Sequence, residues 1–101
     1  MTAFTQVIEI TADTPDAVWD HVAAWHDQQA GSAPGYVGAR VLEDRDRPGT
    51  YLIEVDFTSQ EEAKRNSARP ESSAWAERLA TIARSGPEYR NLDQICTTRR
   101  R

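Results

Sequence analysis

The sequence predicts an α+β fold of the ferredoxin-like, split βαβ type, with a four-stranded antiparallel sheet that carries helices on one face. The first observation behind this is the order of elements along the 101 residues, β-α-β-β-α-α-β. The second is that the clearest strand, residues 50–57, has large apolar side chains at every second position, so its two faces differ in polarity. Because no repeat or linker interrupts the chain, we expect one domain over residues 1–98 and a basic tail over 99–101.

The first strand and the first helix follow one another directly. Residues 6–11 are rich in β-branched side chains and predict a strand. Asp13 or Thr14 is placed to cap a helix whose first turn accommodates Pro15, and this helix is expected to stop near Gly31. One narrow stripe at helical spacing predicts the face by which it packs: Val18, Val22, Trp25 and Gln29.

A hairpin is predicted next. Residues 36–44 and 50–57 alternate in polarity, and the turn residues Asp46-Arg47-Pro48-Gly49 separate them. In the second strand of the hairpin, one set of side chains is expected to face the helices: Tyr51, Ile53, Val55 and Phe57.

Two helices and a last strand complete the pattern. Ser59 and Glu62 have the spacing of a capping box, so a second helix begins there and runs to about residue 69, where the following proline disfavours helical geometry. A third helix is predicted over residues 71–84 and a last strand over residues 92–97.

The sheet face without helices is expected to carry too many apolar side chains to be fully exposed to solvent. Only 17 residues are Leu, Ile, Val or Phe, which makes a thin core for a single domain. A mixture of apolar and charged residues is expected on the open face: Val7, Glu9, Arg40, Leu42, Leu52 and Glu54. We therefore predict a homodimer in which two such faces pack together.

Composition excludes several classes of protein. The net charge is −4, and it is −7 without the three arginines of the tail, which argues against a nucleic-acid partner. No segment is apolar and long enough to cross a membrane, and no signal-like start is present, so a cytoplasmic location without membrane partners is expected. A single cysteine, Cys96, cannot form an intrachain disulfide or a multi-cysteine zinc site and is expected to be buried and inert.

Four segments are characteristic in combination with this element order: 12–15, 45–49, 66–71 and 89–92, which read Ala-Asp-Thr-Pro, Arg-Asp-Arg-Pro-Gly, Asn-Ser-Ala-Arg-Pro-Glu and Tyr-Arg-Asn-Leu. With them, the chain resembles the dimeric α+β barrel superfamily and, within it, the antibiotic biosynthesis monooxygenase-like proteins, over residues 6–97. The family includes cofactor-free oxygenases of polyketide and aromatic molecules, heme-degrading enzymes and members without a known activity.

The second helix predicts a small-molecule site. Its inner face offers Asn66 and Ser67 in place of large apolar residues, so a cavity is expected between it and the strand residues Tyr51, Ile53 and Val55. Trp75 is expected to form one wall. The alternatives are that Asn66 hydrogen-bonds the break before Pro70 and that Trp75 is a core residue.

The resemblance implies roles for these residues. Asn66 would donate to a developing oxyanion, and Trp75 would stack on the substrate ring or donate its indole N–H. Tyr51 would transfer or donate a proton, and Arg90 or Arg40 would stabilise the anion if it points inward. The substrate-contacting residues are then expected to be Ile53, Val55, Ser67, His26 and Arg90.

The resemblance implies three candidate functions, and the first is preferred: a cofactor-independent monooxygenase of an aromatic or polyketide-like molecule. The second is a non-catalytic ligand-binding or structural dimer, and the third is a heme-binding protein. Residues 59–85 contain no histidine, which counts against heme degradation, although His26 would remain as an unusual iron ligand. His21 and His26 are five residues apart and are expected at surface or boundary positions without a metal. Nucleotide-binding and hydrolase motifs are absent, and the chain has little room for a flavin.

Overall fold

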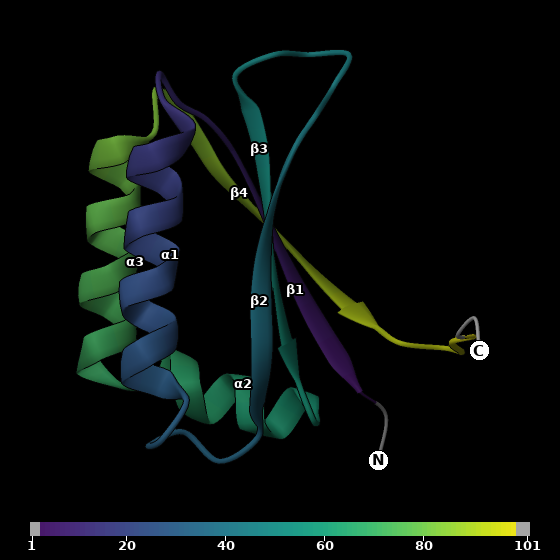
Figure 1. Ribbon diagram of the computed structural model, residues 1–101. Helices are drawn as coiled ribbons and strands as arrows, with labels where there is room; N and C mark the ends of the chain where they lie inside the picture. The colour runs from purple at the N-terminus through teal and green to yellow at the C-terminus, as the bar shows by residue number, and fades with distance from the viewer. Residues whose placement is uncertain (1–2, 99–101) are drawn as a thin grey trace.

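The computed structural model of the protein describes residues 3–98, and it has the predicted order of elements. The elements are β1 (Phe4–Thr11), α1 (Pro15–Gln29), β2 (Tyr36–Glu43), β3 (Thr50–Phe57), α2 (Gln60–Ser67), α3 (Pro70–Ile82) and β4 (Ser85–Asp93). The four strands form one antiparallel sheet in the order β2-β3-β1-β4 (Figure 1). The predicted ferredoxin-like α+β fold is therefore confirmed. The predicted basic tail, 99–101, lies outside the described residues.

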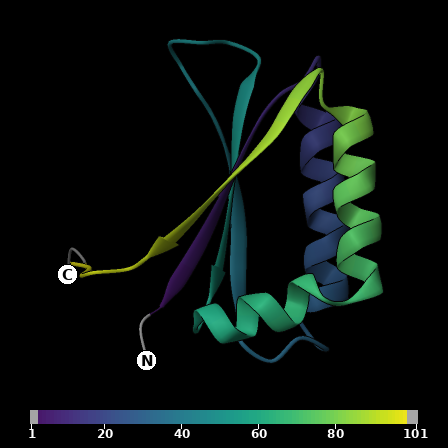
Figure 2. The ribbon, with the colours of Figure 1, turned by 180° about the vertical axis from the view of Figure 1, so that it is seen from behind.

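The helices lie on one face of the sheet. Helices α1 and α3 run side by side over it, and the short helix α2 lies across one end of this pair, as the two opposite views show (Figures 1 and 2). No described helix covers the other face of the sheet.

Strand register decides which side chains face the helices. Ile8 pairs with Ile53 on β3 and with Tyr89 on β4, so these three residues share the helix-facing side. The strands and helices together bury an aliphatic core: Ile8, Ile10, Val18, Val22, Ile53, Val55 and Leu79. The stripe predicted on α1 is confirmed, because its four members are the buried residues of that helix.

The last strand differs most from the prediction. It begins at Ser85, directly after α3, and ends at Asp93, so the predicted range of 92–97 is wrong. Its sequence is polar and lacks β-branched residues, which removes the usual strand signal. Gly86 has a φ of +86°, and it lets the chain reverse from α3 into the strand within a few residues. The consequence is that Tyr89 and Arg90 belong to the sheet.

Two further features concern side-chain exposure. The register of β2 shifts between Tyr36 and Gly38, so that Tyr36 packs on the core while Val37 is exposed on the open face. Cys96 lies beyond β4 and is exposed, so the expected burial of its thiol is wrong. Within residues 3–98, no helix has the length and apolar character needed to cross a membrane.

Candidate functional site

Helix α2 is short and carries few large apolar side chains toward the sheet. It begins as predicted, with the Ser59 hydroxyl accepting a hydrogen bond from the Glu62 N–H at 3.3 Å. Its only buried residues are Ala63 and Asn66. Because these side chains are small, the space between α2 and the end of the sheet is not filled.

A cavity of about 320 Å³ occupies this space. This volume lies at the lower end of the range of about 300–1,000 Å³ that is usual for small-molecule sites. Its walls come from β1, β3, β4, α1, α2 and α3. They are mainly apolar and aromatic, with a few amides and hydroxyls: Gln6, Ile8, Trp25, Val55, Phe57, Ala63, Asn66, Ser67, Ser72, Ser73, Trp75, Ala76 and Tyr89.

Trp25 and Trp75 form the aromatic wall. Their ring centroids are 5.2 Å apart, and their planes are tilted by 35°. Tyr36 packs on Trp25 in a T-shaped arrangement at 5.4 Å, and His21 stacks on Trp75 at 4.9 Å with nearly parallel planes. Each indole therefore packs against a second ring as well.

Asn66 is the central polar group. The residue is 8% exposed, and its side-chain oxygen has no hydrogen-bond partner. The break before Pro70 is closed by the backbone instead, because the Arg69 N–H donates to the Asn66 carbonyl oxygen at 3.1 Å. The structure therefore does not show the alternative in which the Asn66 side chain caps this break.

Four of the predicted site residues lie around one cavity. Asn66 and Ser67 come from α2, Val55 from β3 and Trp75 from α3. Trp75 has one feature that the sequence did not indicate: its indole N–H already donates to the His21 carbonyl oxygen at 3.2 Å. It is therefore not free to donate to a ligand.

Tyr51, Ile53 and His26 lie elsewhere. Tyr51 and Ile53 face the helices but come earlier on β3 than Val55, and they are buried in the core away from the cavity wall. His26 points from another flank of α1, where its Nδ1 is 2.6 Å from the Tyr36 hydroxyl. The prediction that these three residues share the cavity is wrong, because it rested on periodicity, which gives a face and not a position along it.

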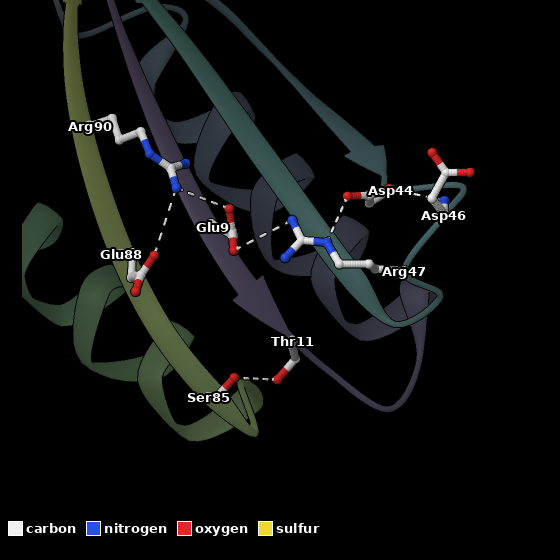
Figure 3. A network of polar contacts seen from close by, with 8 residues as sticks. All are labelled: Glu9, Thr11, Asp44, Asp46, Arg47, Ser85, Glu88 and Arg90. Carbon is white, nitrogen blue, oxygen red and sulfur yellow. Dashed lines mark hydrogen bonds and ion pairs between the residues drawn. The ribbon is translucent and has the colours of Figure 1, made fainter.

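Arg90 lies on the opposite face of the sheet. It follows Tyr89, which faces the helices, so its side chain must point outward. Its guanidinium is 3.2 Å from the Glu9 carboxylate, and Arg47 lies 4.0 Å from the other oxygen of Glu9 (Figure 3). Arg40 also faces outward, paired with Glu54. Neither arginine points inward, as an anion-stabilising role would require.

The sequence did not reveal Tyr89, Trp25, Ser72 and Gln6 as cavity residues. Tyr89 was missed because the last strand was expected to begin after it. Tyr89 is 45% exposed, and its partial burial raises the pKa of the phenol further above neutral pH, where an ordinary tyrosine hydroxyl is already a protonated hydrogen-bond donor. A correct start for β4 would have placed Tyr89 on the inner face.

No charged side chain lines the cavity among the described residues. In the same part of the chain, no group of three or more His, Cys, Asp or Glu residues is arranged to hold a metal ion. An anion formed in the cavity would be stabilised by amide, hydroxyl and indole dipoles.

An apolar cavity with a few convergent polar groups, placed between the sheet and helices of a ferredoxin-like fold, is characteristic of small-molecule sites. No protein-family model and no curated protein sequence matches the chain.

Solved structures do match. The cofactor-independent oxygenase SnoaB from Streptomyces nogalater, solved as an asparagine-to-alanine variant, is 22% identical, with a TM-score of 0.75 over 94% of this chain and 95% of its own. A candidate antibiotic biosynthesis monooxygenase from Nitrosomonas europaea is 13% identical, with a TM-score of 0.74 over 92% and 90%. A third, from Caulobacter crescentus, is 12% identical, with a TM-score of 0.77 over 93% and 91%. The chain thus has the fold of the antibiotic biosynthesis monooxygenase-like proteins, as the resemblance in its sequence implied.

Proposed function

We propose that the protein is a homodimeric, cofactor-independent monooxygenase that oxidises an aromatic or polyketide-like molecule in the cavity between α2, α3 and the sheet. The observation that carries the proposal is Asn66, whose side-chain amide lies nearly buried on the wall of a mainly apolar cavity and does not close the break before Pro70. The fold shared with SnoaB, which is a cofactor-independent oxygenase, supports the same reaction class.

The chemistry starts with the substrate. Loss of a proton from an activated ring CH₂ group leaves an enolate, and the Asn66 amide N–H donates to its oxygen. The enolate carbon passes its electron pair to O₂, and a proton from water completes a C–O–OH group. Loss of water across the C–H and O–O bonds leaves a carbonyl, so one oxygen atom enters the product and the other leaves as water.

The cavity supplies no charged base for the first step among the described residues. The proton therefore passes to water, and the substrate must be acidic enough to lose it. Anthrone-type carbon acids and quinols meet this condition, because their conjugate bases are delocalised over aromatic rings. Trp75 and Trp25 offer apolar ring surface against which such a planar anion packs.

The open sheet face supports the homodimer. It carries exposed or half-exposed apolar side chains, of which Leu42 is 38% and Leu92 46% exposed. The same face carries paired charges. Glu9 pairs with Arg90 (Figure 3). Arg40 pairs with Glu54. Packing two such faces covers the apolar residues and leaves the charges already paired, which limits the cost of their burial.

Oxygen uptake tests the proposal. Wild type, Asn66→Ala and the surface control Gln60→Ala are mixed with a panel of anthrone- and quinol-type substrates, and consumption is measured above the protein-free background. Loss of one oxyanion donor is expected to lower turnover by about 10²–10³-fold in Asn66→Ala only. No protein-dependent uptake across the panel contradicts the oxygenase. Ligand-dependent melting shifts without turnover then identify a binding protein.

A further inference from the structure

Tyr36 lies against two successive residues of α1. Its ring packs edge-on against Trp25, with 5.4 Å between the ring centroids and 81° between the planes. Its hydroxyl oxygen lies 2.6 Å from Nδ1 of His26, the next residue of the helix. The register shift in β2 between Tyr36 and Gly38 accompanies the packing of Tyr36 on the core. One tyrosine thus joins an indole on one side to an imidazole on the other.

Ring contacts continue in both directions from this tyrosine. Trp25 packs against Trp75 at 5.2 Å, and both indoles line the cavity between α2, α3 and the sheet. At the other end, His26 lines a separate surface groove beside α1 and β2, and this groove shares no lining residue with the cavity. An aromatic row therefore runs from the cavity wall to a different part of the surface: Trp75, Trp25, Tyr36 and His26.

The aromatic row holds a tyrosine beside a base. Indole and phenol rings are among the side chains most easily oxidised by one electron, but a phenol gives up its electron readily only when its proton leaves as well. Burial and the negative charge of Asp56 raise the pKa of Tyr36, so its phenolate is not the form present at neutral pH. In the tautomer that carries its proton on Nε2, the imidazole of His26 accepts the Tyr36 proton at Nδ1.

The surroundings of Trp25 favour electron transfer from Tyr36. The Nε1 of Trp25 is buried and has no hydrogen-bond partner within residues 3–98. An oxidised indole is a weaker oxidant once it has lost its N–H proton to a base or to water. Because Nε1 has no such acceptor, oxidised Trp25 keeps its positive charge, and burial makes that charge unfavourable. Tyr36 is the ring neighbour that can supply an electron and release a proton at the same time.

We propose that the aromatic row is a radical-transfer chain that carries oxidising equivalents from the cavity to the protein surface. A one-electron oxidant in the cavity, such as a peroxyl radical, takes an electron from Trp25, directly or through Trp75, and becomes a peroxide anion. Trp25 regains an electron from Tyr36 while the phenolic proton moves to His26 Nδ1, which leaves a neutral tyrosyl radical and an imidazolium. A soluble reductant such as ascorbate returns the electron, and His26 returns the proton.

The chain in this way protects the cavity wall from irreversible oxidation. It rests on the proposed function only for the source of peroxyl radicals in the cavity.

Pulse radiolysis tests the radical-transfer chain without any substrate. Azide radicals oxidise tryptophan in preference to tyrosine at neutral pH, and the two protein radicals differ in their visible absorption. The full chain is used with Trp19→Phe and Cys96→Ser, which remove an exposed indole and an exposed thiol outside the aromatic row. The tyrosyl radical is expected to appear as the tryptophanyl radical decays, at a rate that is independent of protein concentration and slower in D₂O.

Three variants in this background locate the transfer. Tyr36→Phe is expected to abolish the tyrosyl signal and to prolong the tryptophanyl radical. Tyr89→Phe is the matched control and should leave the rate unchanged, because Tyr89 lines the cavity without belonging to the aromatic row. His26→Gln keeps a polar side chain but removes the base, and it should slow transfer by about 10-fold or more.

Circular dichroism checks that each variant is folded. Transfer that survives in Tyr36→Phe, that is lost in Tyr89→Phe, or that keeps its wild-type rate in His26→Gln overturns the proposal.

Oxidation products give a second readout. Wild type, Tyr36→Phe and Tyr89→Phe are exposed to peroxyl radicals from a water-soluble azo initiator with ascorbate present, and peptide mass spectrometry measures the oxygen added to Trp25 and Trp75. Faster oxidation of these indoles in Tyr36→Phe alone is expected, and equal oxidation in all three proteins overturns the protective role. Neither measurement contains a substrate, so failure of the oxygenase proposal leaves both outcomes unchanged and distinguishable.

Discussion

His21 and Trp75 hold each other through two hydrogen bonds and a ring stack. His21 Nε2 lies 2.9 Å from the Trp75 carbonyl oxygen, and Trp75 Nε1 donates to the His21 carbonyl oxygen at 3.2 Å. Their ring centroids are 4.9 Å apart, with 5° between the planes. This pair joins α1 to α3 and fixes one wall of the cavity.

The pair makes stability depend on pH. Burial lowers the pKa of His21, the hydrogen bond to Trp75 partly offsets this, and the positive charge of Arg78 lowers it further. The unfolded chain, with an ordinary pKa of about 6.5, therefore binds the proton more readily than the folded chain. The free energy of unfolding is expected to fall as pH drops below this value.

Chemical denaturation of wild type and His21→Gln between about pH 8 and pH 5 measures this contribution. The stability advantage of wild type is expected to be largest at the upper end and to shrink as pH falls. An advantage that grows on acidification would mean that the charged imidazolium is the form stabilised by folding.

The Tyr89 hydroxyl is expected to contribute to ligand binding. Tyr89 lines the cavity, and partial burial raises the pKa of its phenol further above neutral pH, so the hydroxyl is a neutral donor. Tyr89→Phe is expected to weaken binding of anthrone, measured without oxygen, by about 5-fold, which corresponds to about one hydrogen bond, with little change in melting temperature. Tyr36→Phe is the control, because that hydroxyl bonds His26 outside the cavity and its loss should lower stability instead. Unchanged affinity in Tyr89→Phe would remove this residue from the site.

Gly86 is expected to tolerate no side chain. It has a φ of +86°, and a Cβ added there would lie 2.7 Å from the Glu9 carbonyl oxygen. Gly86→Ala should cost about 1–3 kcal/mol in the free energy of unfolding. At Gly38 nothing lies within 4 Å of an added Cβ, so Gly38→Ala is the matched control and should change stability by less than about 1 kcal/mol. Equal effects in urea denaturation would contradict the close approach of β4 to β1.

A charge on the open sheet face is expected to break the dimer. Leu52 is half-buried in the single chain and lies on that face between Leu42 on β2 and Glu9 on β1. Sedimentation should give twice 11.3 kDa for wild type. Leu52→Asp is expected to sediment as a monomer with a lower melting temperature, because folding and association are linked. Trp19→Asp, on the exposed side of α1, should remain dimeric. A stable wild-type monomer would contradict dimerisation through the open sheet face.

Much of the fold could be predicted because local signals agreed with one another. The hairpin alternates in polarity, Ser59 caps α2 as its spacing indicates, and Val18 and Val22 mark the buried stripe of α1. Strand β4 could not be found in the same way, because its polar sequence is held by pairing with β1 and not by its own propensity.

The site was harder to predict than the fold. Asn66 was indicated because a small polar residue at an inner helix position leaves space. Trp25 and Trp75, however, have equal donor capacity in the sequence, and only the structure shows that the Trp75 N–H is paired with the His21 carbonyl oxygen while the Trp25 N–H is not paired. The face on which Arg90 lies could not be predicted, because β4 was expected to begin after it. Successive residues of a strand point to opposite faces of the sheet, so the position of Arg90 within β4 decides its face.

Isotope labelling tests the oxygenase proposal most directly. The metal-free protein is incubated under ¹⁸O₂ with the anthrone- or quinol-type substrate that gives the highest uptake, and the product is analysed by mass spectrometry against a protein-free control. One labelled oxygen atom per product molecule is expected, at a protein-dependent rate that falls by about 10²-fold or more in Asn66→Ala. Product that forms no faster than in the protein-free control, or at the same rate in Asn66→Ala, would contradict an oxygenase centred on this residue.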